Sequence, residues 1–241
     1  MHNSSKINSE VKSMKIKERK PIDKWEFKLN KKIVNELNNK EYLEVCGSKK
    51  SKRCFSNVCG KNKMINNSLK SSKTSSVKKE NKDILCELKG YGNASDAYHQ
   101  TASSPEGAGA CLAMRKALEK AGLAPGDIDY INAHGTGTMN NDLSEGRAIE
   151  AVFESSIPCF SSTKSFTGHT LGASGGIEAV LSVLSIRNNF VFPNLNFTDQ
   201  MKELTISPET ELNKSKKINH VLSNSFGFGG NNTSLIFSRY N

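Results

Sequence analysis

Apolar and polar residues follow two different patterns along the chain. Residues 1–82 are rich in Lys, Asn and Ser and place apolar residues at no steady period, except for one amphipathic stretch from Trp25 to Leu37 that predicts a short surface helix. Such a composition buries too little apolar surface to offset the entropy lost on folding. We therefore predict that residues 1–82 form a largely disordered segment.

From residue 83 onward, strand-like and helix-like segments alternate. Short apolar runs predict strands at 84–88, 128–133, 159–162, 221–223 and 235–237. Apolar residues at helical spacing predict a helix that has Pro105 at its first position and ends at Gly122, and a second helix over 143–153. The segment 177–186 is apolar at nearly every position, which predicts a helix buried on all sides. This alternation is typical of an α/β layered domain over residues 83–241.

Charge divides the chain at nearly the same place. Residues 1–90 carry 23 Lys and Arg against 10 Asp and Glu, a net charge of +13, whereas residues 91–241 carry 11 against 14, a net charge of −3. The high pI of the chain, 9.3, therefore comes from its first segment, and it does not indicate that the whole chain binds nucleic acid. A basic nucleic-acid arm in residues 1–82 stays open as an alternative, although aromatic residues are sparse there.

Neither membrane insertion nor secretion is indicated. The sequence has no run of about 18 apolar residues and no apolar signal core near Met1, so we expect a cytoplasmic protein. Six cysteines without CxxC spacing favour free thiols in a reducing compartment. A zinc site at Cys46, Cys54 and Cys59 would need a fourth ligand that is not evident, so we expect no metal.

Three polar clusters follow predicted strands, where α/β proteins place their sites. The first is the turn from His134 to Thr138, whose glycines permit close backbone approach. A histidine at the end of a strand can also be purely structural. The second cluster combines Lys164, His169 and Glu178. Lys164 can form a buried ion pair with Glu178, polarise a reacting group, or do both.

The third cluster is the glycine-rich segment 224–232, which contains Phe226 and Phe228 and lies between the last two predicted strands. Its glycines can merely relieve strain in a hairpin. Alternatively, its backbone N–H groups can bind an anion, and its two phenylalanines can act as a gate. The residues alone leave both interpretations open.

Together with His99-Gln100-Thr101 and the segment 105–110, the three clusters resemble the β-ketoacyl-acyl carrier protein synthases of the thiolase-like superfamily. The resemblance runs from about Leu88 to Phe237. It implies the C-terminal half of a thiolase-like layered fold, with a mixed sheet, helices and one buried helix. It also implies acyltransferase chemistry in fatty acid or polyketide synthesis. In this chemistry a cysteine holds the growing acyl chain as a thioester, malonyl on the acyl carrier protein is decarboxylated, and the resulting enolate attacks the acyl-cysteine.

The resemblance also assigns site roles. In this family two histidines bind the malonyl thioester oxygen, a lysine orients them beside a glutamate, threonines bind the phosphopantetheine arm, and a phenylalanine turn gives an oxyanion donor and a gate. By position these are His134 and His169, Lys164 with Glu178, Thr136 and Thr138, and Phe228 with Gly229. No cofactor of its own is implied, because the carrier protein brings the phosphopantetheine. Gly137 and Met139 replace a Ser and a Pro common in fatty-acid members, which favours a polyketide or aryl-polyene type.

The cysteine nucleophile has no counterpart here. The family carries it in a Thr-Ala-Cys-Ser-Ser-type turn of the first half, and the similar run at 101–104 has no Cys. Cys86, Cys111 and Cys159 are predicted to be buried apolar-like residues. We therefore expect that this chain alone cannot form the acyl-enzyme and cannot catalyse the condensation reaction.

Two interpretations of the missing nucleophile stay open. One is a truncated or rearranged synthase that needs a first-half polypeptide. The other is a non-catalytic partner of a complete synthase, like a chain-length factor. In either case the domain should expose a face meant for the absent half, which predicts poor solubility or dependence on a partner.

Overall fold

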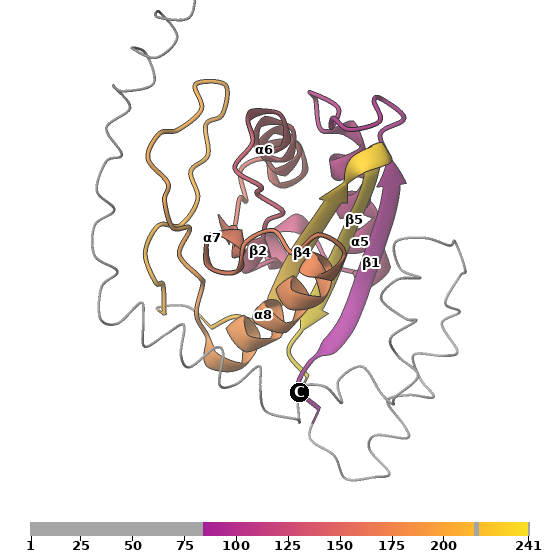
Figure 1. Ribbon diagram of the computed structural model, residues 1–241. Coiled ribbons are helices and arrows are strands. Elements are labelled where there is room, and N and C mark those ends of the chain that lie inside the picture. The colour runs from indigo at the N-terminus through magenta and orange to yellow at the C-terminus, as the bar shows by residue number, and fades with distance from the viewer. Residues whose placement is uncertain (1–83, 215–216, 241) are drawn as a thin grey trace, which may run out of the picture. The chain divides into compact units, whose positions relative to one another are not determined.

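The computed structural model describes residues 84–214 and 217–240. The predicted helix near Trp25 and the cysteines at positions 46, 54 and 59 lie outside them. The described residues form one mixed sheet with the strand order β1-β5-β4-β2-β3 (Figure 1). The strands are β1 (Glu87–Ser95), β2 (Tyr130–Asn132), β3 (Cys159–Ser161), β4 (His220–Gly227) and β5 (Asn231–Ser238). The α/β prediction is confirmed.

The direction of the strands explains where the polar clusters meet. β2 pairs in parallel with both β3 and β4, whereas β5 pairs antiparallel with β4 and β1. The carboxyl ends of β2, β3 and β4 therefore lie at one edge of the sheet. The first two polar clusters follow β2 and β3, and the third begins inside β4 and runs through its carboxyl end into β5.

The first strand is misplaced in the prediction. Residues 84–86 are not in a strand, and β1 instead runs from Glu87 to Ser95. Gly90 and Gly92 interrupt its apolar pattern because helix α5 (Ala108–Ala121) packs directly on the backbone there. A Cβ atom at Gly92 would lie 2.0 Å from the Ala113 carbonyl oxygen, and one at Gly90 would lie 2.4 Å from the Ala117 carbonyl oxygen.

Helices cover both faces of the sheet. α5 (Ala108–Ala121) and α6 (Met139–Phe153) lie on one face, and α8 (Ser174–Asn188) crosses the other (Figure 1). A short helix, α7 (Lys164–Thr167), follows β3. The core between the sheet and the first two helices includes Met114, Leu118, Ile131, Ile149, Val152, Leu222 and Ile236. Within the described residues, every helix is too short or too polar to cross a membrane.

The predicted helix ends are partly wrong. α5 begins at Ala108 rather than at Pro105, because Gly107 has a left-handed φ of 63° and its N–H closes a turn onto the Ser104 carbonyl (2.9 Å). The predicted end at Gly122 is confirmed, with a left-handed φ of 65°. α6 begins at Met139 rather than at residue 143.

α8 is buried on every side over residues 181–186, as its sequence predicts, but not over its first half. Ser174, Glu178, Leu181 and Ser185 recur at helical spacing and are buried. On the opposite face, Gly176, Ala179 and Val180 are only half-buried, whereas Val183 is buried. A helix that is apolar on every side requires a covering layer on both faces, and the described residues provide the second layer only in part.

Candidate active site

The end of β2 carries His134 into a tight turn held by Glu145 of α6. The carboxylate of Glu145 accepts hydrogen bonds from the His134 N–H (2.9 Å), the Gly135 N–H (2.8 Å) and the Asn224 side-chain amide (3.1 Å). Burial raises the pKa of Glu145, and these hydrogen bonds oppose that rise. Glu145 therefore fixes the backbone at His134.

Glu145 has no role in the sequence-based prediction, although the sequence contains a signal for it. It lies four and seven residues before Ile149 and Val152, on the buried face of α6. A carboxylate at such a position needs several hydrogen-bond donors when it is buried. That requirement identifies it as a candidate for holding a nearby backbone turn.

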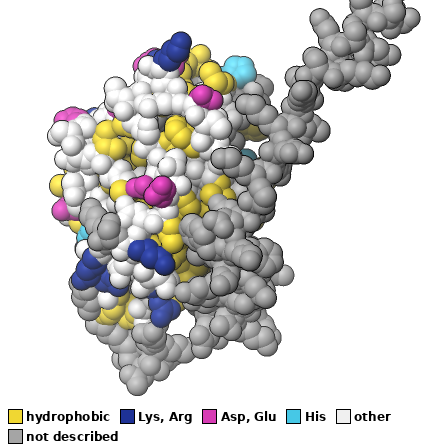
Figure 2. All heavy atoms as spheres, turned by 90° about the vertical axis from the view of Figure 1, so that its left-hand side faces the viewer, with side chains coloured by type: hydrophobic (Ala, Val, Ile, Leu, Met, Phe, Trp, Pro, Cys, Tyr) yellow, Lys and Arg dark blue, Asp and Glu magenta, His cyan; other side chains and the backbone are white. Residues whose placement is uncertain are grey.

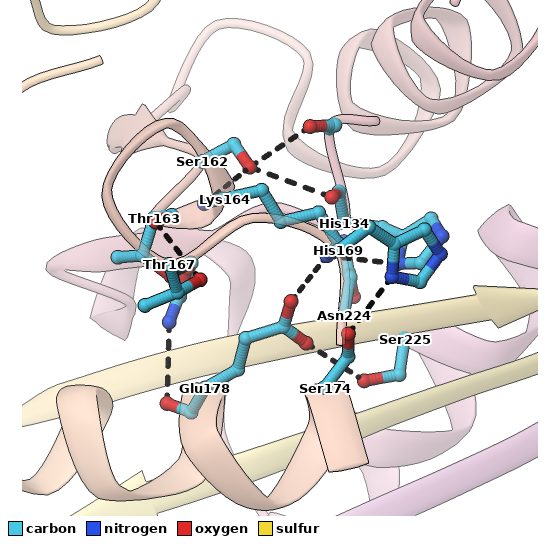
Figure 3. Close-up of polar contacts among 12 residues, drawn as sticks. His134, Ser162, Thr163, Lys164, Thr167, His169, Ser174, Glu178, Asn224 and Ser225 are labelled. Carbon is cyan, nitrogen blue, oxygen red and sulfur yellow. Dashed lines mark hydrogen bonds and ion pairs between the residues drawn. The ribbon is translucent and has the colours of Figure 1, made fainter. Parts of the chain in front are cut away.

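Ser162 ties the segment after β2 to the segment after β3. Its hydroxyl donates to the Gly135 carbonyl (2.9 Å). Gly135 has a φ of 38°, and a Cβ atom there would lie 2.5 Å from the Ser162 Cβ, so this position requires glycine. The close approach brings Lys164 beside the edge of the His134 ring (Figure 3).

Lys164 lies between an acid and an imidazole, and its side chain is only 6% exposed. Its ammonium Nζ forms an ion pair with Glu178 Oε1 and lies 3.2 Å from His134 Nδ1 (Figure 3). Glu178 Oε2 accepts a further hydrogen bond from the Ser225 hydroxyl (3.2 Å). The structure therefore combines the buried ion pair with the polarising position, the two arrangements that the sequence leaves open.

This contact sets the tautomer of His134. An ammonium group can only donate, so Nδ1 accepts and the ring hydrogen lies on Nε2. The pKa of His134 falls to about 3, first because burial disfavours the charged ring and then because Lys164 and His169 are nearby. At neutral pH the ring is therefore neutral and Nε2–H is a donor.

His169 lies beside His134 and has its hydrogen on the same ring nitrogen. The two ring centroids are 5.4 Å apart and the rings are nearly perpendicular, at 86°. His169 Nδ1 accepts from the Leu171 N–H (3.3 Å) and lies 2.9 Å from the Ser174 hydroxyl. Because Nδ1 accepts, the neutral ring carries its hydrogen on Nε2. The site thus holds two neighbouring N–H donors, an arrangement suited to stabilising negative charge on one oxygen.

The remaining predicted residues lie on loops near the same edge of the sheet. The Thr136 and Thr138 hydroxyls are 3.0 Å apart, and the Phe228 side chain is 78% exposed. The Gly229 N–H donates to the Gln100 carbonyl (2.7 Å), so this amide is already occupied. In the described part of the chain, no hydrogen bond joins these loops to the histidine pair. Only Phe228 to Gly230 form the turn itself, since β4 and β5 take up the rest of the segment 224–232.

Comparison with known proteins shows which family this part of the chain resembles. Residues 85–198 match the family described as beta-ketoacyl synthase, C-terminal domain. The 3-oxoacyl-(acyl-carrier-protein) synthase 2 of Rhizobium meliloti is 48% identical over 158 residues, which are 65% of this chain and 38% of that protein. The corresponding enzyme of Coxiella burnetii is 46% identical, over 68% of this chain and 40% of its own. The chain carries a β-ketoacyl synthase C-terminal domain.

Solved structures agree with this assignment. A chain of the complex between the ketosynthase ApeO and its chain length factor ApeC from Xenorhabdus doucetiae matches with a TM-score of 0.59 and 43% identity over 66% of this chain and 40% of that one. A β-ketoacyl synthase of Burkholderia phymatum matches with a TM-score of 0.64 and 36% identity, over 69% and 40%. The chain thus spans about two fifths of the length of its relatives, and it resembles them over the synthase C-terminal domain.

The three described cysteines of the synthase domain form no disulfide and are half-buried rather than buried. Cys86 precedes β1, and burial followed by the charge of Glu87 raises its pKa to about 12. A thiol with so high a pKa stays protonated at neutral pH and is a poor nucleophile. Cys111 packs against the hydrophobic core, as an apolar-like residue does.

The low pKa of His134 predicts a pH-dependent stability. Its pKa is about 3 in the folded domain and 6.5 ordinarily, so the unfolded state binds more protons between these values. This contribution is complete above pH 6.5 and is lost as the pH falls toward 3, with a slope of up to about 1.4 kcal/mol per pH unit. We expect urea unfolding between about pH 7 and pH 4 to show this slope, and His134→Gln to reduce it. Equal slopes in both proteins would contradict the assignment, since Glu145 and the other groups are common to both.

Proposed function

We propose that the synthase domain decarboxylates a malonyl thioester carried by an acyl carrier protein, which is the activating step of a decarboxylative Claisen condensation. The observation that carries this proposal is the pair of neutral histidines, His134 and His169, with both Nε2–H groups available beside a buried ammonium. Charge stabilisation by such fixed donors is often the largest single contribution to catalysis.

The step follows from the chemistry of the donors. The malonyl carboxylate leaves as CO2, and the electron pair of the broken carbon–carbon bond forms an enolate with negative charge on the thioester oxygen. The two Nε2–H groups donate to that oxygen, and their hydrogen bonds strengthen as the charge develops. Because both rings are neutral in this role, neither has to supply a proton.

The other proposed roles belong to the loops around the pair. The Thr136 and Thr138 hydroxyls would bind the phosphopantetheine arm, so the domain would need no resident cofactor. The Phe228 ring would gate the acyl chain, and its N–H would bind the second thioester oxygen. The Gly229 N–H does not join it, because Gln100 already accepts from that amide.

Condensation would need a second polypeptide that carries the cysteine and the first half of the fold. Among the described residues, the large apolar residues with the highest exposure are Met139 at 75%, Leu171 at 77% and Phe228 at 78%, and each is a predicted site residue or lies within two residues of one. Figure 2 shows one side of the described part, where hydrophobic side chains reach the surface between small groups of charged ones. Together with the half-buried residues of α8, these side chains favour a partner that covers the site from outside.

A second candidate is a non-catalytic partner of a complete synthase. It is favoured by the missing cysteine and by two similar structures, the ishigamide ketosynthase/chain length factor and the ApeO–ApeC complex. The intact arrangement of His134, Lys164 and His169 favours the catalytic alternative, because a scaffold has no need of two oriented donors. For either function we propose a cytoplasmic location.

A reconstitution experiment tests the proposal. The full chain is mixed with a polypeptide spanning the first half of the Rhizobium meliloti relative, and malonyl-carrier protein labelled in its free carboxyl group is added. We expect labelled CO2 from the mixture and none from the first-half polypeptide alone, and a β-ketoacyl product when acyl-carrier protein is also present. Absence of CO2 from a complex shown to form by size-exclusion chromatography would overturn the proposal. Condensation by the chain alone would overturn the need for a partner.

A further inference from the structure

His134 and His169 are held in the same tautomer by different groups. His134 Nδ1 faces the Lys164 ammonium at 3.2 Å, whereas no ammonium contacts His169 within the described residues. His169 Nδ1 instead faces the hydroxyl of Ser174 at 2.9 Å (Figure 3). Ser174 is the first residue of α8 and is 5% exposed, so its side chain has little access to water.

The direction of the hydrogen bonds around Ser174 can be worked out from its neighbours. The Leu171 N–H can only donate, and it points at His169 Nδ1 from 3.3 Å, so Nδ1 is an acceptor. The Ser174 hydroxyl must then donate to Nδ1 as well. The Thr170 hydroxyl, 3.3 Å from Ser174 Oγ, can donate to Ser174 in turn. The two hydroxyls and the imidazole thus form a chain that ends on Nδ1.

We propose that Ser174 is a positioning residue that holds the His169 ring with Nε2–H directed toward the substrate oxygen. The Leu171 contact is longer than the Ser174 contact, and hydrogen bonds weaken with distance, so Ser174 provides the stronger restraint on the ring. The catalytic meaning of this restraint rests on the proposed function, whereas the restraint itself does not.

Removing the hydroxyl should loosen the ring without removing the donor. In Ser174→Ala the ring keeps only the Leu171 contact on Nδ1, so rotated rings and the Nδ1–H tautomer become populated. For one neutral hydrogen bond we expect a fall of about threefold to tenfold in kcat for decarboxylation. KM should change little, because the interaction matters most when negative charge develops.

The test uses the full chain labelled with 15N at its five histidines. Above the imidazole pKa range, the wild-type His169 signals should show a hydrogen-bonded, unprotonated Nδ1 and a protonated Nε2. His169→Gln identifies these signals by removing them. Ser174→Ala should move both nitrogen shifts toward the values of a freely exchanging ring. The matched control is Ser185→Ala, which removes a buried serine hydroxyl from the same helix, where it donates to the Phe190 carbonyl.

The outcomes separate this inference from the proposed function. His169 signals that are the same in Ser174→Ala and wild type would overturn it, and so would an equal displacement in Ser185→Ala. A displacement specific to Ser174→Ala supports it whether or not the reconstituted enzyme releases CO2. If CO2 is released, an unchanged kcat in Ser174→Ala would overturn the catalytic part.

Discussion

Substituting Lys164 by Met is expected to lower the free energy of unfolding by about 3–5 kcal/mol, because it leaves the Glu178 carboxylate buried without its partner. The two side chains are 6% and 3% exposed, so water cannot replace the lost charge. Urea unfolding of the full chain, followed by circular dichroism, measures the change.

The domain itself offers a matched control for this experiment. Arg147 and Glu106 form an ion pair of 2.7 Å whose side chains are 31% and 77% exposed. Glu106→Gln should cost less than about 1 kcal/mol. The double variant Lys164→Met/Glu178→Leu should recover much of the stability, since apolar replacement of a whole buried pair is often neutral. A Lys164→Met cost no larger than that of Glu106→Gln would show that the pair is effectively solvated.

Substituting His169 by Ala is expected to lower the decarboxylation rate of the reconstituted enzyme by about 10²–10³, the usual cost of one oxyanion donor. The fall should lie in kcat, because the hydrogen bond strengthens only as charge develops. Labelled CO2 release at several malonyl-carrier protein concentrations separates kcat from KM.

The control for His169 is His220→Gln. His220 lies at the start of β4, opposite the end that reaches the site, and its Nδ1 contacts the Ser238 hydroxyl (2.8 Å). This variant should keep nearly full activity if it folds, which circular dichroism checks. Equal losses in the two variants would point to a general structural effect and would contradict the assigned role.

The sequence predicts the layers of this domain well because most of its elements are short apolar runs separated by clear breaks. β2 and β3 lie where expected, and β4 and β5 contain the predicted strands 221–223 and 235–237 but extend further, to the turn at Phe228–Gly230. β1 is misplaced because its packing depends on Gly90 and Gly92, which carry no hydrophobic signal. α5 starts late because Gly107, rather than Pro105, sets the backbone at its first turn.

The site is harder to predict from sequence because its geometry depends on residues distant along the chain. The polar clusters could be placed at strand ends, but the tautomers of His134 and His169 depend on contacts with Lys164, Leu171 and Ser174. The role of Glu145 depends on backbone N–H groups across the interior. Such contacts follow from the strand order, which no local pattern specifies.

The strand order also has a consequence for how the domain is made on the ribosome. β4 and β5 are the last described strands to be synthesised, yet they occupy the middle of the sheet and join β1 to β2. Until they emerge, the β2–β3 pair and the helices around it have no central strands to pack on. Closure of the sheet therefore waits for pairings between residues far apart in sequence, which are slow to form. During that interval the nascent chain has unpaired strand edges. We expect binding by a chaperone to have its largest effect at this stage.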